Sequence, residues 1–257
     1  MTSAVQMHNQ FEFLQEHYRL TKSKPSDASG LSSEDLLHTS EVIKFIDDEL
    51  IPLLNAPSRL VAASQFSKKY AFLITVPFFS SFTLFDQVLN IDIDQCSVQP
   101  DSKKGFKGPR LMLKSERTSP TATDREGAVH NAIEKVFKNH VRLVWERLNE
   151  AASVPMPVLW ENTAIYIYWL YETSLLKHDL VAQRKIQEDF DLLLEAPGEC
   201  FGLNENPLKK FHHEKRELLK SAPLVRVRKT CCLYYEVNEE RKFCKTCPRC
   251  LSGYTES

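Results

Sequence analysis

Apolar residues recur at helical spacing in four stretches of the chain. In residues 36–54, 124–148 and 180–195 they return every three or four positions, which predicts helices with one buried face. Residues 158–176 are apolar on most sides, which predicts a central core helix. Pro57 suits the first turn of a further helix.

That further helix is expected to end near Tyr70, where the composition changes to the Phe, Ile, Val and Thr that favour strands. The predicted strands span residues 72–78, 81–86, 88–93, 110–114 and 224–237. Polar residues 97–109 and 196–207 predict exposed loops. Runs of helices with one cluster of strands predict an α+β fold, mostly helical with a small antiparallel sheet and a C-terminal cysteine-rich segment.

The composition is that of a globular protein. The chain has 257 residues, of which 42% are hydrophobic and 26% are charged. Its start lacks the basic and apolar regions of a secretory signal. The longest uncharged run, residues 70–85, is shorter than the roughly 20 apolar residues that a membrane-spanning helix needs. We therefore expect a cytoplasmic protein without stable membrane insertion.

Charge is distributed unevenly along the chain. Residues 207–250 hold twelve Lys or Arg and five acidic residues, a net charge of +7, whereas the rest of the chain carries −8. This asymmetry suggests a basic surface that faces an anionic partner. The same segment contains His212 and His213, which adjoin on a charged stretch and point in different directions, so a surface role is favoured over iron ligation.

The cysteines cluster near the C-terminus. Five of the seven lie within twenty residues: Cys231, Cys232, Cys244, Cys247 and Cys250. The first four form the pattern C-C-x11-C-x2-C. Disulfides are not expected without a secretory signal, whereas four clustered thiolates suit either zinc or an iron–sulfur centre. Neighbouring side chains on an extended strand point to opposite faces, so the adjacent pair favours a wider two-iron cluster over a single zinc ion.

This CC…CxxCP segment resembles the siderophore iron reductases of the FhuF type, a family defined by C-C-x10-C-x2-C that ligates a 2Fe–2S cluster. The strand VRVRKTCCLYY and the segment WENTAIYIYWLYE at 160–172 are also similar to that family. The resemblance implies Cys231, Cys232, Cys244 and Cys247 as cluster ligands. The chain departs from the pattern in its eleven-residue spacer and in Cys250, which stands as an alternate ligand.

The resemblance further implies one-electron reduction of a ferric siderophore of the hydroxamate or citrate-hydroxamate type, with release of Fe(II) in the cytoplasm. It implies a siderophore-binding body in residues 1–222 and a cluster-binding segment in 223–257. The chain has no G-x-G-x-x-G and no P-loop. We therefore expect an external electron donor, such as a ferredoxin or an NAD(P)H-dependent reductase, and no catalytic residue beyond the cluster.

An anionic chelate would need basic partners. The candidates are Arg226, Arg228, Lys229, Lys245, Arg249, Arg110, Lys114 and His130. Trp160 and Glu161, at the start of the core helix, are expected to be packing and capping groups.

Two other functions stay open from the residues alone. One is a zinc-stabilised module that binds a protein or a nucleic acid. No nucleic-acid motif accompanies the basic residues, so we expect no nucleic-acid partner. The other is an iron–sulfur sensor or electron carrier without a substrate.

Overall fold

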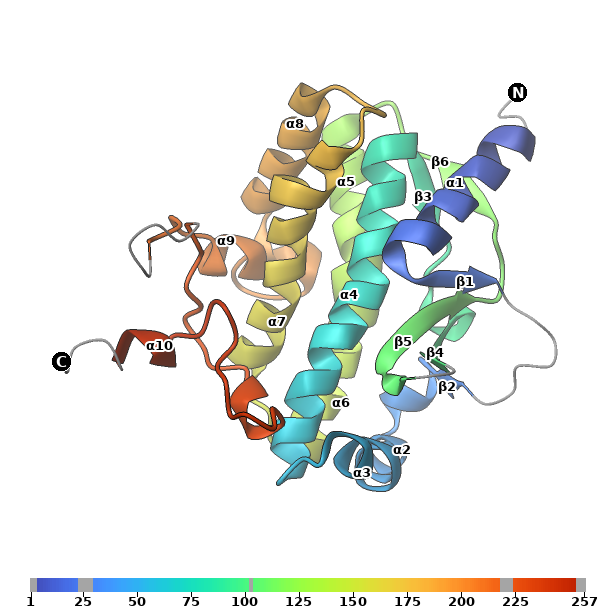
Figure 1. The fold of residues 1–257 in the computed structure, drawn as a ribbon. Helices are drawn as coiled ribbons and strands as arrows, with labels where there is room; N and C mark the ends of the chain where they lie inside the picture. The colour runs from blue at the N-terminus through green and yellow to red at the C-terminus, as the bar shows by residue number, and fades with distance from the viewer. Residues whose placement is uncertain (1–3, 23–29, 102–103, 218–223, 253–257) are drawn as a thin grey trace.

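Two long helices form the centre of the molecule in the computed structural model, which describes residues 4–22, 30–101, 104–217 and 224–252 (Figure 1). They are α4 (Arg59–Phe85) and α7 (Met156–Trp169), which pack against each other. The other α-helices are α1 (Ala4–Tyr18), α2 (Thr39–Phe45), α3 (Ile51–Leu54), α5 (Arg125–Ile133), α6 (Arg142–Ala152), α8 (Gln183–Glu195), α9 (Pro207–Phe211) and α10 (Arg249–Ser252).

Several helices continue through π-helical turns. These turns are η2 (Ile46–Leu50), η4 (Glu134–Val141) and η5 (Leu170–Ser174). Short 3₁₀ turns complete the helical structure: η1 (Asp35–Leu37), η3 (Ile93–Gln95), η6 (Leu175–Lys177), η7 (Gly198–Phe201) and η8 (Tyr234–Glu236). The three helices predicted from periodicity and the apolar core helix are confirmed, since helical structure covers 39–54, 125–152, 156–177 and 183–195.

The predicted strands at 72–78 and 81–86 are wrong, because both segments belong to α4. Nearly every side chain from 61 to 84 is buried, so this helix is apolar all round and shows no helical stripe. Ser58 caps its start by accepting a hydrogen bond from the backbone of Val61. The Thr75 hydroxyl donates to a carbonyl one turn earlier, which satisfies a buried polar group inside the helix.

The main sheet is mixed and has four strands in the order β1-β5-β4-β2. Its strands are β1 (Leu20–Lys22), β2 (Leu31–Ser32), β4 (Cys96–Asp101) and β5 (Gly105–Leu113); a second pair joins β3 (Gln87–Leu89) to β6 (Thr118–Pro120). The fold class is confirmed, with β1 pairing parallel to β5 inside an otherwise antiparallel sheet.

Two assignments in this region need correction. The predicted loop at 97–109 is wrong, because it holds most of β4 and the start of β5. Buried Cys96 and Val98 alternate with more exposed neighbours there, a half-buried pattern that the polar composition hid. The predicted strand at 110–114 is confirmed as the end of β5, whereas the strand at 88–93 shrinks to β3.

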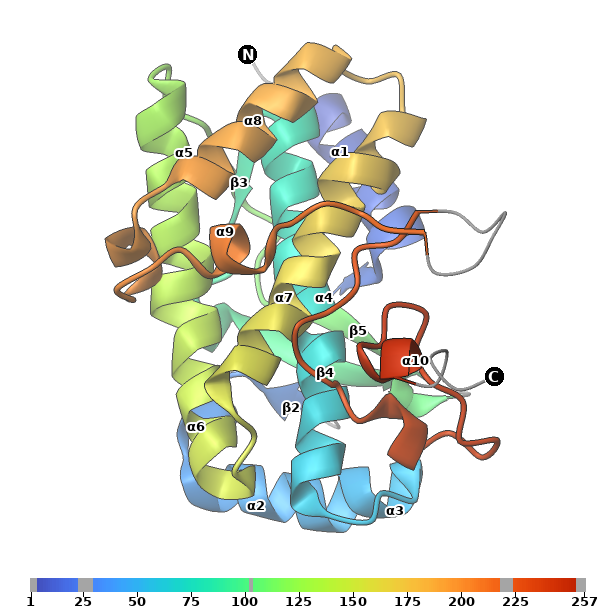
Figure 2. The same cartoon turned by 90° about the vertical axis from the view of Figure 1, so that its left-hand side faces the viewer.

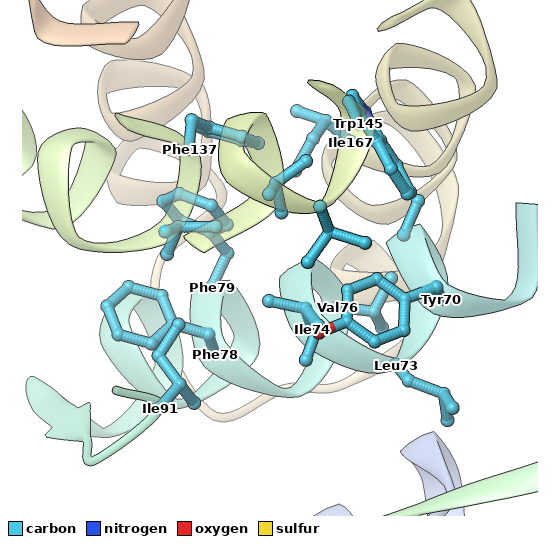
Figure 3. Close-up of a cluster of buried hydrophobic side chains, with 14 of the residues drawn as sticks. Tyr70, Leu73, Ile74, Val76, Phe78, Phe79, Ile91, Phe137, Trp145 and Ile167 are labelled. Atoms are coloured by element: carbon cyan, nitrogen blue, oxygen red, sulfur yellow. The ribbon is translucent and has the colours of Figure 1, made fainter. Parts of the chain in front are cut away.

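One hydrophobic cluster joins α4 to the helices around it (Figure 3). Phe79 of α4 stacks on Phe137, with ring centroids 5.6 Å apart. The hydroxyl of Tyr70 lies 2.7 Å from Nε2 of His140, whose Nδ1 lies 2.7 Å from the carbonyl oxygen of Ile91. Buried polar groups are thus paired within this core.

The cysteine segment, residues 224–250, lies over α4 and the first half of α7 (Figure 2). The strand predicted at 224–237 is wrong: the structure has one isolated bridge there, between Arg216 and Val225. The predicted boundary between 1–222 and 223–257 falls at residues outside the described ranges and stays a prediction. Within the described residues, no helix is long and apolar enough to cross a membrane.

Candidate metal centre and adjoining pocket

The adjacent cysteine pair is anchored to both central helices. The carbonyl oxygen of Cys232 accepts hydrogen bonds from Ser64 Oγ (2.9 Å) and Gln65 Nε2 (2.5 Å) of α4. On α7, the carboxylate of Glu161 accepts the backbone N–H groups of Lys229 (2.6 Å) and Thr230 (2.7 Å). The chain is therefore held immediately before and after Cys231.

Two of the thiols, one from each half of the motif, lie close together. The sulfur atoms of Cys232 and Cys244 lie 3.7 Å apart. Two thiolates at about 2.3 Å from one tetrahedral metal lie roughly 3.8 Å apart, so this pair has the spacing of two ligands of one metal atom. Cys247 is also buried, and Cys231 and Cys250 are half-buried. Among the described residues, no three His, Cys, Asp or Glu side chains are placed to hold one ion.

The surroundings of Cys232 favour its charged form. The pKa of Cys232 is lowered, first by its contact with the Cys244 thiol and then by Lys68, Arg228 and the backbone N–H of Tyr234, against the opposing effect of burial. The ammonium nitrogen of Lys68 lies 3.9 Å from the Cys232 sulfur. Cationic groups and N–H groups next to thiolates offset the negative charge of an iron–sulfur cluster, so the donor set fits such a group.

Arg228 does not serve as a free cation. It forms an ion pair with Glu161 in which the closest atoms lie 3.6 Å apart and the two side chains are 1% and 2% exposed. Its guanidinium also donates to Asn162 Oδ1 at 2.6 Å. Among the described residues its Nε has no hydrogen-bond partner. This arginine therefore holds the cysteine segment to α7, and Glu161 is the polar partner that we had expected only to cap the helix.

Arg226 is neutralised in the same way. Its two terminal nitrogens donate to the carboxylate of Glu172 at 3.1 and 2.7 Å, and its guanidinium lies over the ring of Tyr168. Burial alone would raise the pKa of Glu172, but hydrogen bonds from Arg226 and Lys215 outweigh it and lower the pKa to about 2. His212 joins this group through a 2.9 Å contact with Arg226, so it has a structural role.

The other predicted basic residues divide into two groups. Lys229, Lys245 and Arg249 belong to the cysteine segment; Lys229 Nζ donates to a backbone carbonyl, and Arg249 donates to Tyr235 Oη at 2.6 Å. The remaining candidates, Arg110, Lys114 and His130, lie on β5, just after it and on α5. Within the described residues, none of these three lines the pocket described next.

A pocket of about 540 Å³ adjoins the cysteine segment. One side is aromatic, formed by Phe72 of α4 with Tyr166 and Trp169 of α7. The rings of Phe72 and Tyr166 meet edge to face at 5.4 Å. Arg228 and Thr246, one of the two residues between Cys244 and Cys247, also line this space. The pocket therefore adjoins residues next to the cysteines, although no cysteine is among its described lining residues.

Comparisons with known families agree with this arrangement. A family model described as "Ferric iron reductase FhuF-like transporter" matches residues 64–219, which is more than half of the chain. A second, described as "FhuF 2Fe-2S C-terminal domain", matches residues 228–249. No curated protein gives a significant match. The second match supports a 2Fe–2S cluster as the cofactor, in place of structural zinc.

Proposed function

The chain belongs to the family of FhuF-like ferric iron reductases, and on this basis we propose that it reduces Fe(III) held by a siderophore of the hydroxamate or citrate-hydroxamate type. The cluster supplies one-electron chemistry: an electron taken from an external donor converts Fe(III) to Fe(II). The hard oxygen donors of a siderophore hold Fe(II) far less well, so the metal is released. We place this release in the cytoplasm.

We assign the cluster to Cys231, Cys232, Cys244 and Cys247. The 3.7 Å separation of the Cys232 and Cys244 sulfurs supports these two as ligands of one iron. The matched domain range, 228–249, includes all four cysteines and ends before Cys250. Cys250 is therefore the less favoured fourth ligand.

The position of the pocket next to the cysteine segment carries the proposal. Arg228 and Thr246 line the pocket, and Arg228 also acts electrostatically on the Cys232 thiol. A chelate in the pocket would lie close to the cysteine segment, with Arg228 and Thr246 between it and the cysteines. The pocket is also of a size typical of small-molecule sites, which span about 300–1,000 Å³.

The residues of the pocket bind and orient rather than transfer protons. Phe72, Tyr166 and Trp169 offer an apolar surface to the organic backbone of the chelate. The paired Arg226 and Glu172 form a rigid polar wall, because each satisfies the other. The pocket thus positions the ferric centre near the cluster, and no acid–base residue is required.

Anaerobic rapid mixing tests the function. Protein with a full cluster is reduced with dithionite, separated from it, and mixed with ferric chelates while cluster absorbance and trapped Fe(II) are followed. Oxidation of the cluster should match Fe(II) formation one to one. Phe72→Ala should raise the chelate concentration at half-maximal rate, whereas Phe243→Ala, an exposed aromatic outside the pocket, should leave it unchanged. A cluster that is not oxidised by any ferric chelate would refute the reductase and favour a sensor.

A further inference from the structure

Four cations from distant parts of the sequence gather beside the pocket. Lys68 and Lys69 are neighbours on α4, Arg19 follows the end of α1, and Lys107 lies on β5. Lys69 Nζ donates to the backbone carbonyl of Lys107 at 2.6 Å, and the charges of Arg19, Lys68 and Lys107 all act on Lys69. We call these four residues the cation cluster.

The described residues give the cation cluster no carboxylate partner, and Lys68 alone lies next to a ligand thiol, that of Cys232. Among the described residues, no carboxylate forms an ion pair with any of its four members. Burial, followed by repulsion from Arg19, Lys68 and Lys107, lowers the pKa of Lys69 to about 8. Arg226 and Arg228, by contrast, are paired with Glu172 and Glu161. Arg19, Lys69 and Lys107 therefore supply positive charge near the metal centre that no described carboxylate neutralises, and the sequence had suggested none of the four residues.

The cation cluster adjoins the aromatic side of the pocket. Phe72 lines the pocket, and the guanidinium of Arg19 lies over its ring, 5.6 Å from the centroid. Lys68 and Lys69 precede Phe72 by four and three residues, which places all three on neighbouring positions of one helix face. A carboxylate bound by the cation cluster could thus belong to the same ligand that fills the pocket.

We propose that the cation cluster is the anion-binding half of the chelate site, and that it selects ferric chelates that carry free carboxylates. The inference rests on the proposed function and specifies its substrate class: a chelate with an apolar backbone against Phe72 and one or more carboxylates against Lys69, Arg19 and Lys107. Lys68 and Lys69 are partly buried, whereas Arg19 and Lys107 are exposed. A carboxylate should be attracted most strongly at Lys69, because less water screens a contact with a partly buried cation.

Binding can be tested apart from reduction by using gallium(III) chelates, since Ga(III) matches Fe(III) in charge but accepts no electron here. The probes are the gallium complex of a carboxylate-bearing citrate-hydroxamate and that of an uncharged trihydroxamate. Calorimetry on the cluster-loaded protein should show that Lys69→Glu weakens the carboxylate-bearing probe about tenfold or more and the uncharged probe less than twofold. Lys44→Glu, on α2 and outside the pocket, is the matched control and should change neither.

The double variant Arg19→Gln with Lys107→Gln removes charge without introducing an acid, and it should show the same selectivity. Equal weakening of both probes, or no weakening of either, would overturn the inference. An unchanged chelate affinity combined with a raised KM for an acidic electron-donor protein would also overturn it, by making the cation cluster a docking site for that protein. Intact gallium-chelate binding without any Fe(III) reduction would instead refute the proposed function.

Discussion

The ammonium nitrogen of Lys68 lies 3.9 Å from the sulfur of Cys232 and 5.3 Å from the centroid of the Tyr234 ring. The lysine comes from the start of α4, 164 residues before the cysteine. Its position links the first half of the chain to the electronic properties of the metal centre, because a cation beside a ligand sulfur stabilises the more negative, reduced cluster.

Lys68→Met should therefore lower the reduction potential of the cluster. Removing one nearby charge is expected to change the reduction equilibrium by about tenfold, which is 59 mV for a one-electron couple. A redox titration followed by electron paramagnetic resonance would measure the shift, with Lys44→Met as the control. An unchanged or raised potential in Lys68→Met would contradict the assignment of Lys68 as a tuning residue.

Glu161 should be essential for holding the cysteine segment. Glu161→Ala leaves Arg228 as a buried, unpaired charge and removes the acceptor of the Lys229 and Thr230 backbone N–H groups. The expected loss is about 3–5 kcal/mol of unfolding free energy, together with lower iron content per protein. Glu205→Ala breaks an exposed pair with Lys210 and should cost at most about 1 kcal/mol. Similar losses in both variants, measured by denaturant unfolding, would argue against this role.

The affinity for a carboxylate-bearing chelate should fall as pH rises above about 8. Lys69 is charged below its lowered pKa of about 8 and neutral above it, so its contribution to the attraction is present at pH 7 and is lost by pH 9.5. Lys69→Arg keeps its charge over this range and should flatten the profile. Calorimetry with the gallium probe at several pH values would show it. A profile that is equally steep in the arginine variant would assign the pH dependence to another group.

The two C-terminal cysteines should respond differently to substitution. Cys247 is 2% exposed, and the N–H groups of Arg249 and Cys250 are directed at its sulfur, whereas Cys250 is half-buried. Cys247→Ser should lose most of its iron and sulfide, and Cys250→Ser should keep them. Metal analysis and visible absorption after anaerobic purification would distinguish the variants. The reverse result would make Cys250 the fourth ligand.

The metal centre could be predicted from the sequence because its signal is local. Cys231 and Cys232 are adjacent, and Cys244 and Cys247 have the spacing of a tight turn, so the spacing of the cysteines alone indicates a metal site. The amphipathic helices were predictable for the same reason, since periodicity reports one buried face. Residues 72–86 gave no such signal, because α4 is buried on all sides and composition alone favoured strands.

The pocket and the cation cluster could not be predicted, because both are made by long-range contacts. Lys69 meets Lys107 and Arg19 only when α1, α4 and β5 are assembled. The sequence predicted a short helix that ends near Tyr70 in place of the full α4. The position of Lys68 on a long central helix could therefore not be predicted. Conversely, Arg226 and Arg228 were basic and near the cysteines, yet nothing local revealed that Glu172 and Glu161 neutralise them.

The way in which the cysteine segment is attached determines which part of the protein opens first. The segment is held by polar contacts from Ser64, Gln65 and Glu161. Among its described residues, only the partly buried Leu233 and Val237 pack against the main hydrophobic cluster. A neutral hydrogen bond contributes about 0.5–1.5 kcal/mol and one to a charged group about 1.5–3 kcal/mol, less in total than the buried core of the helices, so we expect this region to open before the helices do. The bound cofactor holds the cysteine segment in its folded conformation. Amide exchange in 224–250 should therefore become faster when the cofactor is removed, while α4 stays protected. In a cell short of iron, the helical body of the apoprotein would then stay folded while the cysteine segment opens and can take up a new cluster.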